Sequence, residues 1–388
     1  MQERTSLFPQ ESVPLHESLG RFLAEDIFSS ISIPPVDNSA MDGYALNGNG
    51  SHRDGYLLLP SSEVKDAPQN SVEPFSTRIL TGRPVFGWTK CISAQEHCKV
   101  LNNRVFPGAI YPEGHNIRRA GEDAAVGGLL LQKGRTLDAT AIARLASAGI
   151  SMVPLRKRPR VGILTGGDEI VRLPTIPDSK APRFECDSFL LQGMLSEFGA
   201  SPLVFPHLPD DPAVIKATIE DAPTLDMLLT CGGAAESELD FIRPILKELG
   251  TDFLFERVAM KPGRPTAFGF LGPIPVFCLP GNPVAVFSAF HALVRPALAL
   301  MMGQLASSKP SRKIPLGKAF PNDPNRHRLV RAVIDWSANP PKAFPYPDSG
   351  SGLVRSLVDC NSLLSLPCGE DLPVGFLAEV LWMRNGEG

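Results

Sequence analysis

The segment Arg160–Glu169, with the sequence RVGILTGGDE, decides the fold that we predict. Its apolar run is long enough for a buried strand and is followed at once by two glycines and two acids. The chain continues with an apolar helix at Phe189–Phe198 and a second buried strand at Leu225–Thr230, which runs into Gly232 and Gly233. This alternation is typical of a doubly wound parallel sheet, in which ligands bind at the carboxyl ends of the strands. We therefore predict an α/β domain with its site at that edge.

Two further turns indicate an anion site in the same domain. The first, KPGRP at Lys261–Pro265, holds Lys261 and Arg264 on a loop that its prolines stiffen. The second, LPGNP at Leu279–Pro283, leads into an apolar run that reads as a helix beginning at Pro283. Proline is favoured at the first position of a helix, and the amino end of a helix attracts negative charge. Either motif by itself is also compatible with a plain tight turn between a strand and a helix.

Acidic residues beside glycine turns supply the second part of the predicted chemistry. Carboxylate oxygens suit Mg²⁺ on a phosphate ester, because the ion keeps several waters and takes only one or two protein carboxylates. Taken singly, each acid also fits a turn-former or a helix cap. We find no His and Cys set with the spacing of a metal site, no P-loop and no nucleophile elbow. The candidate acids are Asp42, Asp123, Asp168, Glu169, Asp226 and Asp240.

Composition narrows the classes of function. The 388 residues carry a formal net charge of −3, which gives no reason to expect a nucleic acid or an anionic membrane as a partner. The seven cysteines include no CxxC pair, which argues against a disulfide framework and a zinc ribbon. We see no export signal and no run of about eighteen apolar residues, so we expect a cytoplasmic protein.

The rest of the chain predicts small β-rich units beside the α/β domain. The 38 prolines and 34 glycines favour many turns. Residues 45–127 read as short strands and turns, and Thr136–Gly149 reads as an N-capped helix that ends at a glycine. After residue 304, short apolar segments such as Leu329–Ile334 and Ala378–Trp382 suggest a small terminal β-barrel.

Five motifs occur in the order and spacing of one family. They are PPVDNSAMDGYA at 34–45, NIRRAGED at 116–123, GDE at 167–169, KPGRP at 261–265 and LPGNP at 279–283. On these motifs the chain resembles the MoeA/gephyrin E-domain family of molybdopterin molybdenumtransferases over nearly its whole length. The resemblance implies a multi-domain fold of the α/β plus β class, with a doubly wound MogA-like α/β domain, β-rich domains and a C-terminal β-barrel. It also implies an elongated homodimer, whose site lies between the α/β domain of one subunit and the β-rich domain of the other.

The resemblance further implies domain limits and an activity. The limits are a linking domain at 11–27 and 128–157, a β-rich domain at 28–127, the molybdopterin-binding α/β domain at 158–304 and the β-barrel at 305–388. The activity is molybdenum insertion: adenylylated molybdopterin is bound, molybdate joins its dithiolene sulfurs, and the adenylate is hydrolysed with Mg²⁺ to release AMP. Molybdate and tungstate stay open as the oxyanion. A molybdopterin adenylyltransferase and a recipient molybdoenzyme are the further partners implied.

Roles carry over to this chain position by position. Lys261 and Arg264 would hold molybdate or the pterin phosphate. The residues assigned to catalysis are Asp42, Asp123, Glu169, Asp226, Asp240 and Lys261, of which Glu169, Asp226 and Asp240 are also assigned to the metal. The residues assigned to cofactor binding are Thr81, Gly232, Gly233, Lys261, Pro262, Arg264, Pro280, Asn282, Arg331 and Ser351. Asp42, Thr81 and Asp123 are implied to reach in from the partner subunit.

Departures from the family pattern leave a second hypothesis open. Lys90 stands where the family has an aspartate, Ala235 lacks the usual serine hydroxyl, and Glu236 adds negative charge to the phosphate turn, where Ser237 also differs. The helix that usually precedes the Val13 region is missing, as expected of a shortened variant or a truncated gene model. The alternative is therefore a catalytically altered paralogue that acts as a pterin-binding or scaffolding dimer.

Overall fold

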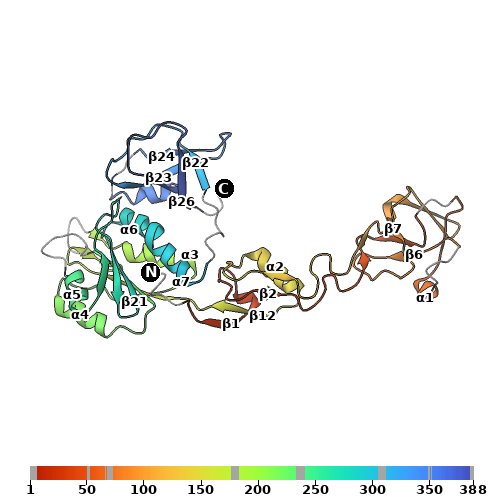
Figure 1. Cartoon of the computed structure of the whole chain (residues 1–388), viewed down its shortest axis with the longest axis horizontal. Helices are drawn as coiled ribbons and strands as arrows, with labels where there is room; N and C mark the ends of the chain where they lie inside the picture. The colour runs from red at the N-terminus through yellow and green to blue at the C-terminus, as the bar shows by residue number, and fades with distance from the viewer. Residues whose placement is uncertain are drawn as a thin grey trace.

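The computed structural model describes residues 7–49, 53–65, 67, 73–175, 183–232, 241–304, 312–347, 350 and 352–384. The chain is elongated, and its elements gather in lobes along the long axis (Figure 1). An α/β lobe and a terminal lobe lie side by side at one end. A small central lobe follows, and a β-rich far lobe lies at the other end.

The α/β lobe is built on a six-stranded sheet with the order β16-β13-β17-β21-β20-β18. The first four strands are parallel, as predicted for a doubly wound sheet, whereas β20 and β18 run antiparallel to their neighbours. The sequence analysis missed this mixed edge. Only Gly272 and Pro273 separate β20 from β21, and so short a connection permits only antiparallel pairing. The strands are β13 (Arg160–Thr165), β16 (Ser201–Val204), β17 (Met227–Cys231), β18 (Asp252–Phe255), β20 (Ala267–Leu271) and β21 (Ile274–Leu279).

Helices cover both faces of this sheet because its strands are apolar on both sides. On β13, Val161 and Ile163 belong to a core shared with α3, α6 and α7, whereas Leu164 belongs to a core shared with α4 and α5. The helices are α3 (Asp187–Phe198), α4 (Pro212–Glu220), α5 (Ile242–Glu248), α6 (Pro283–Ala289), the π-helical turn η3 (Phe290–Val294) and α7 (Arg295–Met301). A short parallel pair, β14 (Ile170–Val171) and β15 (Arg183–Phe184), precedes α3.

The continuous helix Pro283–Met301 has 19 residues and is long and apolar enough to cross a bilayer, with a mean hydropathy of 1.7 over an 18-residue window. Of that window 67% is nevertheless buried inside the protein, where Val286 and Phe290 join the core that also holds α3. Its composition is therefore that of a core helix.

The chain passes through the central lobe twice, once on the way to the far lobe and once on the way back. Strand β1 (Gln10–Pro14) pairs with β12 (Met152–Arg156), and β2 (Ile27–Phe28) pairs with β11 (Leu129–Leu131). Helix α2 (Ala139–Ser147) covers these pairs; Asp138 caps it by accepting a hydrogen bond from Ala141 N, as predicted. Between Val13 and Ile27 the helical structure is limited to the single turn η1 (Leu15–Glu17).

The far lobe is a six-stranded sheet with the order β7-β4-β6-β5-β9-β8. Its core closes around Trp88, whose indole N–H donates to Val64 O. A second pair, β3 with β10, sits beside the sheet. The elements are β3 (Asn38–Ser39), β4 (Gly43–Leu46), β5 (Tyr56–Leu58), α1 (Ser61–Val64), β6 (Phe75–Ile79), β7 (Cys91–Ala94), η2 (Gln95–His97), β8 (Cys98–Leu101), β9 (Arg104–Pro107) and β10 (Ile117–Arg118).

The terminal lobe is a curled sheet with the order β19-β23-β25-β26-β22, and β24 also pairs with β23. Its edges meet at one bridge, from Leu316 to Ala343, and the predicted closed barrel stays a prediction. Strand β19 (Met260–Lys261) comes from a loop of the α/β lobe, so this pairing joins the two lobes. The other elements are β22 (Arg312–Pro315), β23 (His327–Asp335), β24 (Lys342–Pro345), α8 (Arg355–Asp359), β25 (Ser362–Leu366) and β26 (Leu377–Met383).

Candidate functional site

Three glycine turns touch one another at the carboxyl edge of the parallel strands. Gly166 follows β13, Gly232 follows β17 and Gly281 follows β21. A Cβ atom on Gly281 would lie 3.0 Å from Gly232 Cα, and one on Gly232 would lie 3.2 Å from Gly166 O. Gly232 also has a φ of +85°, which favours glycine. The three turns therefore form a backbone surface with no side chains between them, at the edge where the sequence predicted a ligand.

Helix α6 begins at this edge. Its cap is Asn282, whose side-chain oxygen accepts hydrogen bonds from Val284 N at 3.2 Å and Ala285 N at 3.4 Å. Pro283 is the first residue of the helix, as predicted, and Pro280 leads into the turn. Since the Asn282 oxygen is engaged as the cap, this helix end offers a ligand its remaining backbone N–H groups and the field of the helix.

Three carboxylates gather where β13 ends. Asp168 N donates to Asp210 Oδ2 and Asp210 N donates to Asp168 Oδ1, both at 3.2 Å. The Glu169 carboxylate lies beside the same turn, 2.8 Å from the position that a Cβ on Gly167 would take. His207 Nε2 bonds Gly167 O at 2.9 Å and holds the turn in place.

Sequence reasoning missed Asp210. The available signal was the run Asp210, Asp211 and Pro212, which marks a helix start because Asp211 caps α4. Nothing local distinguishes the first acid of that run. Only the parallel pairing of β13 with β16 brings the loop after β16 back to the turn after β13.

The prediction for Asp226 is wrong. The sequence analysis placed it with Glu169 in a magnesium and nucleotide pocket. Asp226 precedes β17, so it lies at the amino edge of the sheet, at the other end of that strand from Gly232. Its Oδ2 accepts a hydrogen bond from Arg160 N at 2.7 Å, which ties the starts of β13 and β17 together. Its role is to fasten the sheet.

Several predicted residues lie outside the described part of the chain, namely Gly233, Asp240 and Ser351, as do Ala235, Glu236 and Ser237. Among the residues described, no three His, Cys, Asp or Glu side chains are close enough together to hold a metal ion. The predicted metal set therefore stays a prediction for Glu169 and Asp240.

Lys261 and Arg264 lie on the loop that joins the α/β lobe to the terminal lobe, and both side chains are exposed. Lys261 on β19 pairs in register with Arg328 on β23, so two cations stand side by side on neighbouring strands. Pro262 directly follows β19. Arg264 accepts a backbone hydrogen bond from Val258 N across the loop. This positive segment is the only part of the predicted anion set that faces solvent freely among the described residues.

Arg331 lies three residues along β23 and is buried, with 6% of its surface exposed. Its guanidinium donates to Ser356 Oγ on α8 and to Gly350 O at 3.4 Å. Because side chains alternate along a strand, Arg331 points to the opposite face from Arg328. The predicted anion contacts are thus split between two faces of β23.

The residues expected from a partner subunit lie far from the α/β lobe of their own chain. Thr81 N and Thr81 Oγ1 each donate to Asp42 Oδ1 at 2.7 Å, in the far lobe beside β3. These two hydrogen bonds lower the pKa of Asp42 below its usual value and keep the carboxylate ionised. Asp123 instead pairs with Arg144 of α2 at 3.2 Å. Figure 1 shows that the far lobe and the α/β lobe occupy opposite ends of the chain.

The positive charge of Lys90 in the far lobe has a neighbouring negative charge. Its ammonium forms an ion pair with Glu113 at 3.2 Å. The charge that departs from the family pattern therefore has a local partner.

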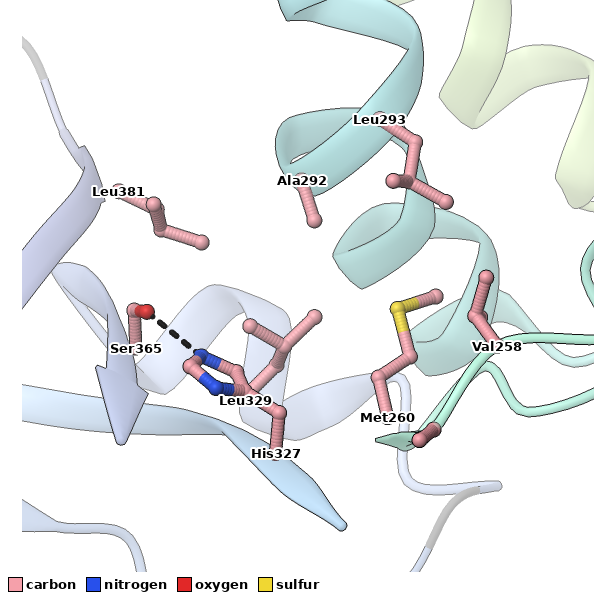
Figure 2. Close-up of a pocket in the computed structure, with 9 residues that line it drawn as sticks. Val258, Met260, Ala292, Leu293, His327, Leu329, Ser365 and Leu381 are labelled. Atoms are coloured by element: carbon pink, nitrogen blue, oxygen red, sulfur yellow. Dashed lines mark hydrogen bonds between the residues drawn. The ribbon is translucent and has the colours of Figure 1, made fainter. Parts of the chain in front are cut away.

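A cavity of about 290 Å³ opens between the α/β lobe and the terminal lobe (Figure 2). Met260, Leu293, Leu329 and similar apolar side chains line it. Its polar pair is engaged internally, because His327 Nε2 bonds Ser365 Oγ at 2.8 Å. His327 and Leu329 line the cavity, and Arg328 between them points to the other face of β23 because side chains alternate along a strand. Lys261 pairs in register with Arg328, so the Lys261 side chain also points away from this cavity. The cavity therefore lacks the features of an anion site.

Asp187, the first residue of α3, is a polar group that no prediction included. It is partly buried, and burial together with the charge of Glu185 raises the pKa of Asp187 from 3.8 to about 7. Glu185 itself is satisfied, since it accepts hydrogen bonds from Ser188 N at 2.6 Å and from Ser188 Oγ at 2.5 Å. Near neutral pH the protein thus keeps an acid here that is part protonated.

Known proteins resemble the whole chain. The MoeA N-terminal region (domain I and II) matches residues 1–149, a probable molybdopterin binding domain matches residues 162–300, and the MoeA C-terminal region (domain IV) matches residues 313–382. The molybdopterin molybdenumtransferase of Haemophilus influenzae is 33% identical over 304 residues, which cover 77% of this chain and 75% of that protein. That of Bacillus subtilis is 29% identical and covers 97% of this chain and 91% of its own.

A solved structure resembles the fold as well. The crystal structure of the molybdopterin biosynthesis MoeA protein from Pyrococcus horikoshii aligns with a TM-score of 0.80 at 28% identity. The alignment covers 98% of this chain and 96% of that one. The likeness therefore extends over all four lobes.

Gly281→Ala tests the contact between the glycine turns. The new Cβ would meet Gly232 Cα at 3.0 Å, closer than most Cβ contacts, so one of the turns must shift slightly. We expect binding of AMP, the nucleotide that the resemblance implies, to weaken several-fold in a calorimetric titration, because small displacements of binding groups are costly. Gly193→Ala on α3 is the control, since nothing lies within 4 Å of its Cβ. Unchanged AMP affinity in Gly281→Ala would contradict the role of this contact.

Asp187→Asn tests the buried acid. Because folding raises the pKa of Asp187 from 3.8 to about 7, the stability of the wild type falls as pH rises through that window. The free energy of unfolding of the variant, minus that of the wild type, should grow from near zero at about pH 4 to at most about 4 kcal/mol at about pH 8. Glu197→Gln, an exposed acid on the same helix, should show no such trend. A difference that does not change with pH would refute the assignment.

Proposed function

The chain belongs to the MoeA family of molybdopterin molybdenumtransferases, and from that premise we propose that it transfers molybdate onto the dithiolene of adenylylated molybdopterin with release of AMP. Its role in molybdenum cofactor biosynthesis follows from the family. The finer statement concerns which residues bind each part of the substrate. The observation that carries it is the contact of three glycine turns beside a helix amino end and three carboxylates.

The glycine turns and α6 suit the phosphate groups of the substrate. Gly166, Gly232 and Gly281 have no side chains, so a ligand at this edge of the sheet can approach their backbone closely. Phosphate oxygens accept hydrogen bonds from backbone N–H groups and are favoured by the positive end of a helix. The carboxyl edge between β13 and β17 is also a topological switch point. From β13 the chain continues to β16 on one side of the sheet, whereas β17 and β21 lie on the other side of β13.

The carboxylates suit Mg²⁺. Among the described residues no Lys or Arg forms an ion pair with Asp168, Glu169 or Asp210, so three acids stand together without a counter-cation. One or two of them would hold the ion, with Asp240 as the further ligand that the resemblance implies and phosphate oxygens as the rest. When bound, Mg²⁺ neutralises charge on the phosphate ester that is hydrolysed.

Cations on the two sides of the lobe junction suit the oxyanion. Lys261, Arg264 and Arg328 present positive charge at the junction, and Arg331 lies buried on the same strand as Arg328. A guanidinium can bind a tetrahedral oxyanion through two parallel hydrogen bonds, whereas Lys261 acts as a point charge. Molybdate and tungstate have the same charge and nearly the same size, so these residues accept either.

A homodimer completes the site in this proposal. Asp42 and Thr81 form a preorganised pair in the far lobe, and their own α/β lobe lies at the other end of the chain. A second chain that runs in the opposite direction would bring this pair to the α/β edge. We place this dimer in the cytoplasm, with a molybdopterin adenylyltransferase as supplier and a molybdoenzyme as recipient.

The alternative is a pterin-binding or scaffolding dimer without the transferase reaction. Its remaining support is the substituted turn after Gly232. The substituted turn at Ala235, Glu236 and Ser237 lies outside the described residues. The ion pair of Lys90 with Glu113 removes part of its other support. A measurement of turnover separates the two functions.

AMP release tests the proposed reaction. Purified protein with adenylylated molybdopterin should release AMP only when both molybdate and Mg²⁺ are present. Asp210→Asn should lower this rate about a hundredfold or more, since it removes a carboxylate where charge is neutralised in the transition state. Asp221→Asn, an exposed acid at the end of α4, is the matched control and should keep the wild-type rate. Tight pterin binding with no AMP release from the wild type would establish the alternative instead.

Subunit mixing tests the composite site. Asp42→Asn and Asp210→Asn chains carrying different tags are each expected to be inactive as homodimers. A heterodimer of the two contains one site in which both residues are intact, so it should recover about half of the wild-type rate of AMP release. An inactive heterodimer would show that Asp42 does not act across the subunit boundary.

A further inference from the structure

Several buried polar atoms beside the carboxyl edge of the sheet have no hydrogen-bond partner among the described residues, and two of them lie on the face that α3 covers. Within the described residues, Asp187 Oδ1 and Thr165 Oγ1 are both buried and neither has a hydrogen-bond partner. Thr165 is the last residue of β13 and is only 3% exposed. A buried polar atom without a partner costs free energy, so each of these two groups requires an explanation.

The two groups lie on the same face of the sheet. Thr165 pairs in register with Cys231, so both side chains point to one face, which is the face that α3 and α6 cover. Asp187 begins α3, and its charge is among the causes that raise the pKa of the Cys231 thiol. Thr165 is therefore the strand neighbour of Cys231, and Asp187 is close enough to act on the charge of its thiol, one residue before the Gly232 turn.

Among the residues that the structure describes, none donates a hydrogen bond to Asp187 Oδ1 or Thr165 Oγ1. Glu185 is engaged with Ser188, and the thiols of Cys186 and Cys231 are the other titratable groups near Asp187. Helix α6 contributes no ionisable residue, and Asp168 and Glu169 at the same edge bring only further negative charge. A hydrogen-bond donor on a bound ligand would therefore satisfy the Asp187 carboxylate.

We propose that Asp187 and Thr165 recognise the 2-amino-4-oxo edge of the substrate's pterin, an inference that rests on the proposed function. That edge presents the 2-amino group, N3–H and O4 in a row, which are two donors followed by one acceptor. A carboxylate accepts from two adjacent N–H groups, and a hydroxyl beside it donates to the carbonyl. Asp187 and Thr165 supply this complement, and both are positioning residues rather than members of the reacting centre.

The adenine of the nucleotide half does not match this pair. Its corresponding edge offers one donor, the 6-amino group, beside the acceptor N1, which repels a carboxylate. Guanine carries the same edge as a pterin, so a guanine nucleotide must be tested separately. The proposal thus predicts which end of the substrate depends on Asp187.

The test is a fluorescence titration of the full-length protein with 6-hydroxymethylpterin. Asp187→Asn should weaken pterin binding about tenfold or more, and Thr165→Val about fivefold, because each removes hydrogen bonds at a buried position. Thr165→Ser keeps the hydroxyl and should bind as the wild type does, as should Glu197→Gln. AMP affinity should stay unchanged in all four variants.

A pH series adds a readout that a merely structural role would not change. The carboxylate is the accepting form, so wild-type affinity for the pterin should rise between about pH 6 and about pH 7.5, while Asp187→Asn should show little change. Competition by GMP that depends on Asp187 supports the recognition of this edge. GMP binding that is tighter than pterin binding would assign the pair to a guanine nucleotide and overturn the proposal.

Three further outcomes would contradict the proposed pterin contacts. Pterin binding that Asp187→Asn leaves intact, no pterin binding by the wild type, or a loss of AMP affinity in its place would each overturn the inference. AMP release by the wild type is measured separately. A protein that releases AMP but binds the pterin independently of Asp187 refutes this inference alone, whereas absence of AMP release refutes the proposed function.

Discussion

The close approach of backbone at Gly166, Gly232 and Gly281 is the constraint on which the rest of the α/β lobe depends. Contacts of 3.0 and 3.2 Å to the missing Cβ positions leave no room for side chains. The ends of β13, β17 and β21 can therefore lie at one level, and α6 can start directly beside them. The other groups of the candidate site follow these strand ends: Asp168 and Glu169 come directly after β13, and Asn282 comes directly after the turn at Gly281.

Charge is distributed unevenly around this edge. Asp168, Glu169 and Asp210 lie around the turn after β13 and have no ion-pair partner among the described residues, although they are not close enough together to form a three-ligand metal site. Asp187 lies below them, where burial makes its ionised form costly. The cations Lys261 and Arg328 lie apart, on the junction with the terminal lobe. In the proposed site, this separation would give the metal, the heterocycle and the oxyanion different surroundings.

The elongated shape has a functional consequence. The chain crosses the central lobe twice, so the far lobe is held at a distance by two antiparallel pairs, β1 with β12 and β2 with β11. Asp42 and Thr81 are preorganised by their mutual hydrogen bonds although nothing in their own chain's α/β lobe is near them. In the proposed homodimer a second chain would supply the surface that they face, and each chain would contribute to two sites.

The sequence by itself determined the local features: the parallel strands at β13 and β17, the helix starts at Asp138 and Pro283, and the glycine turns. These follow from periodicity, caps and φ, which depend on near neighbours. Only the tertiary structure decided which acids meet. Strand pairing brought Asp210 to Asp168 and put Asp226 at the opposite edge of the sheet, because the two ends of a strand look alike in sequence but lie about 15 Å apart in space. The unpaired state of Asp187 is likewise a property of packing, since burial depends on residues distant in the chain.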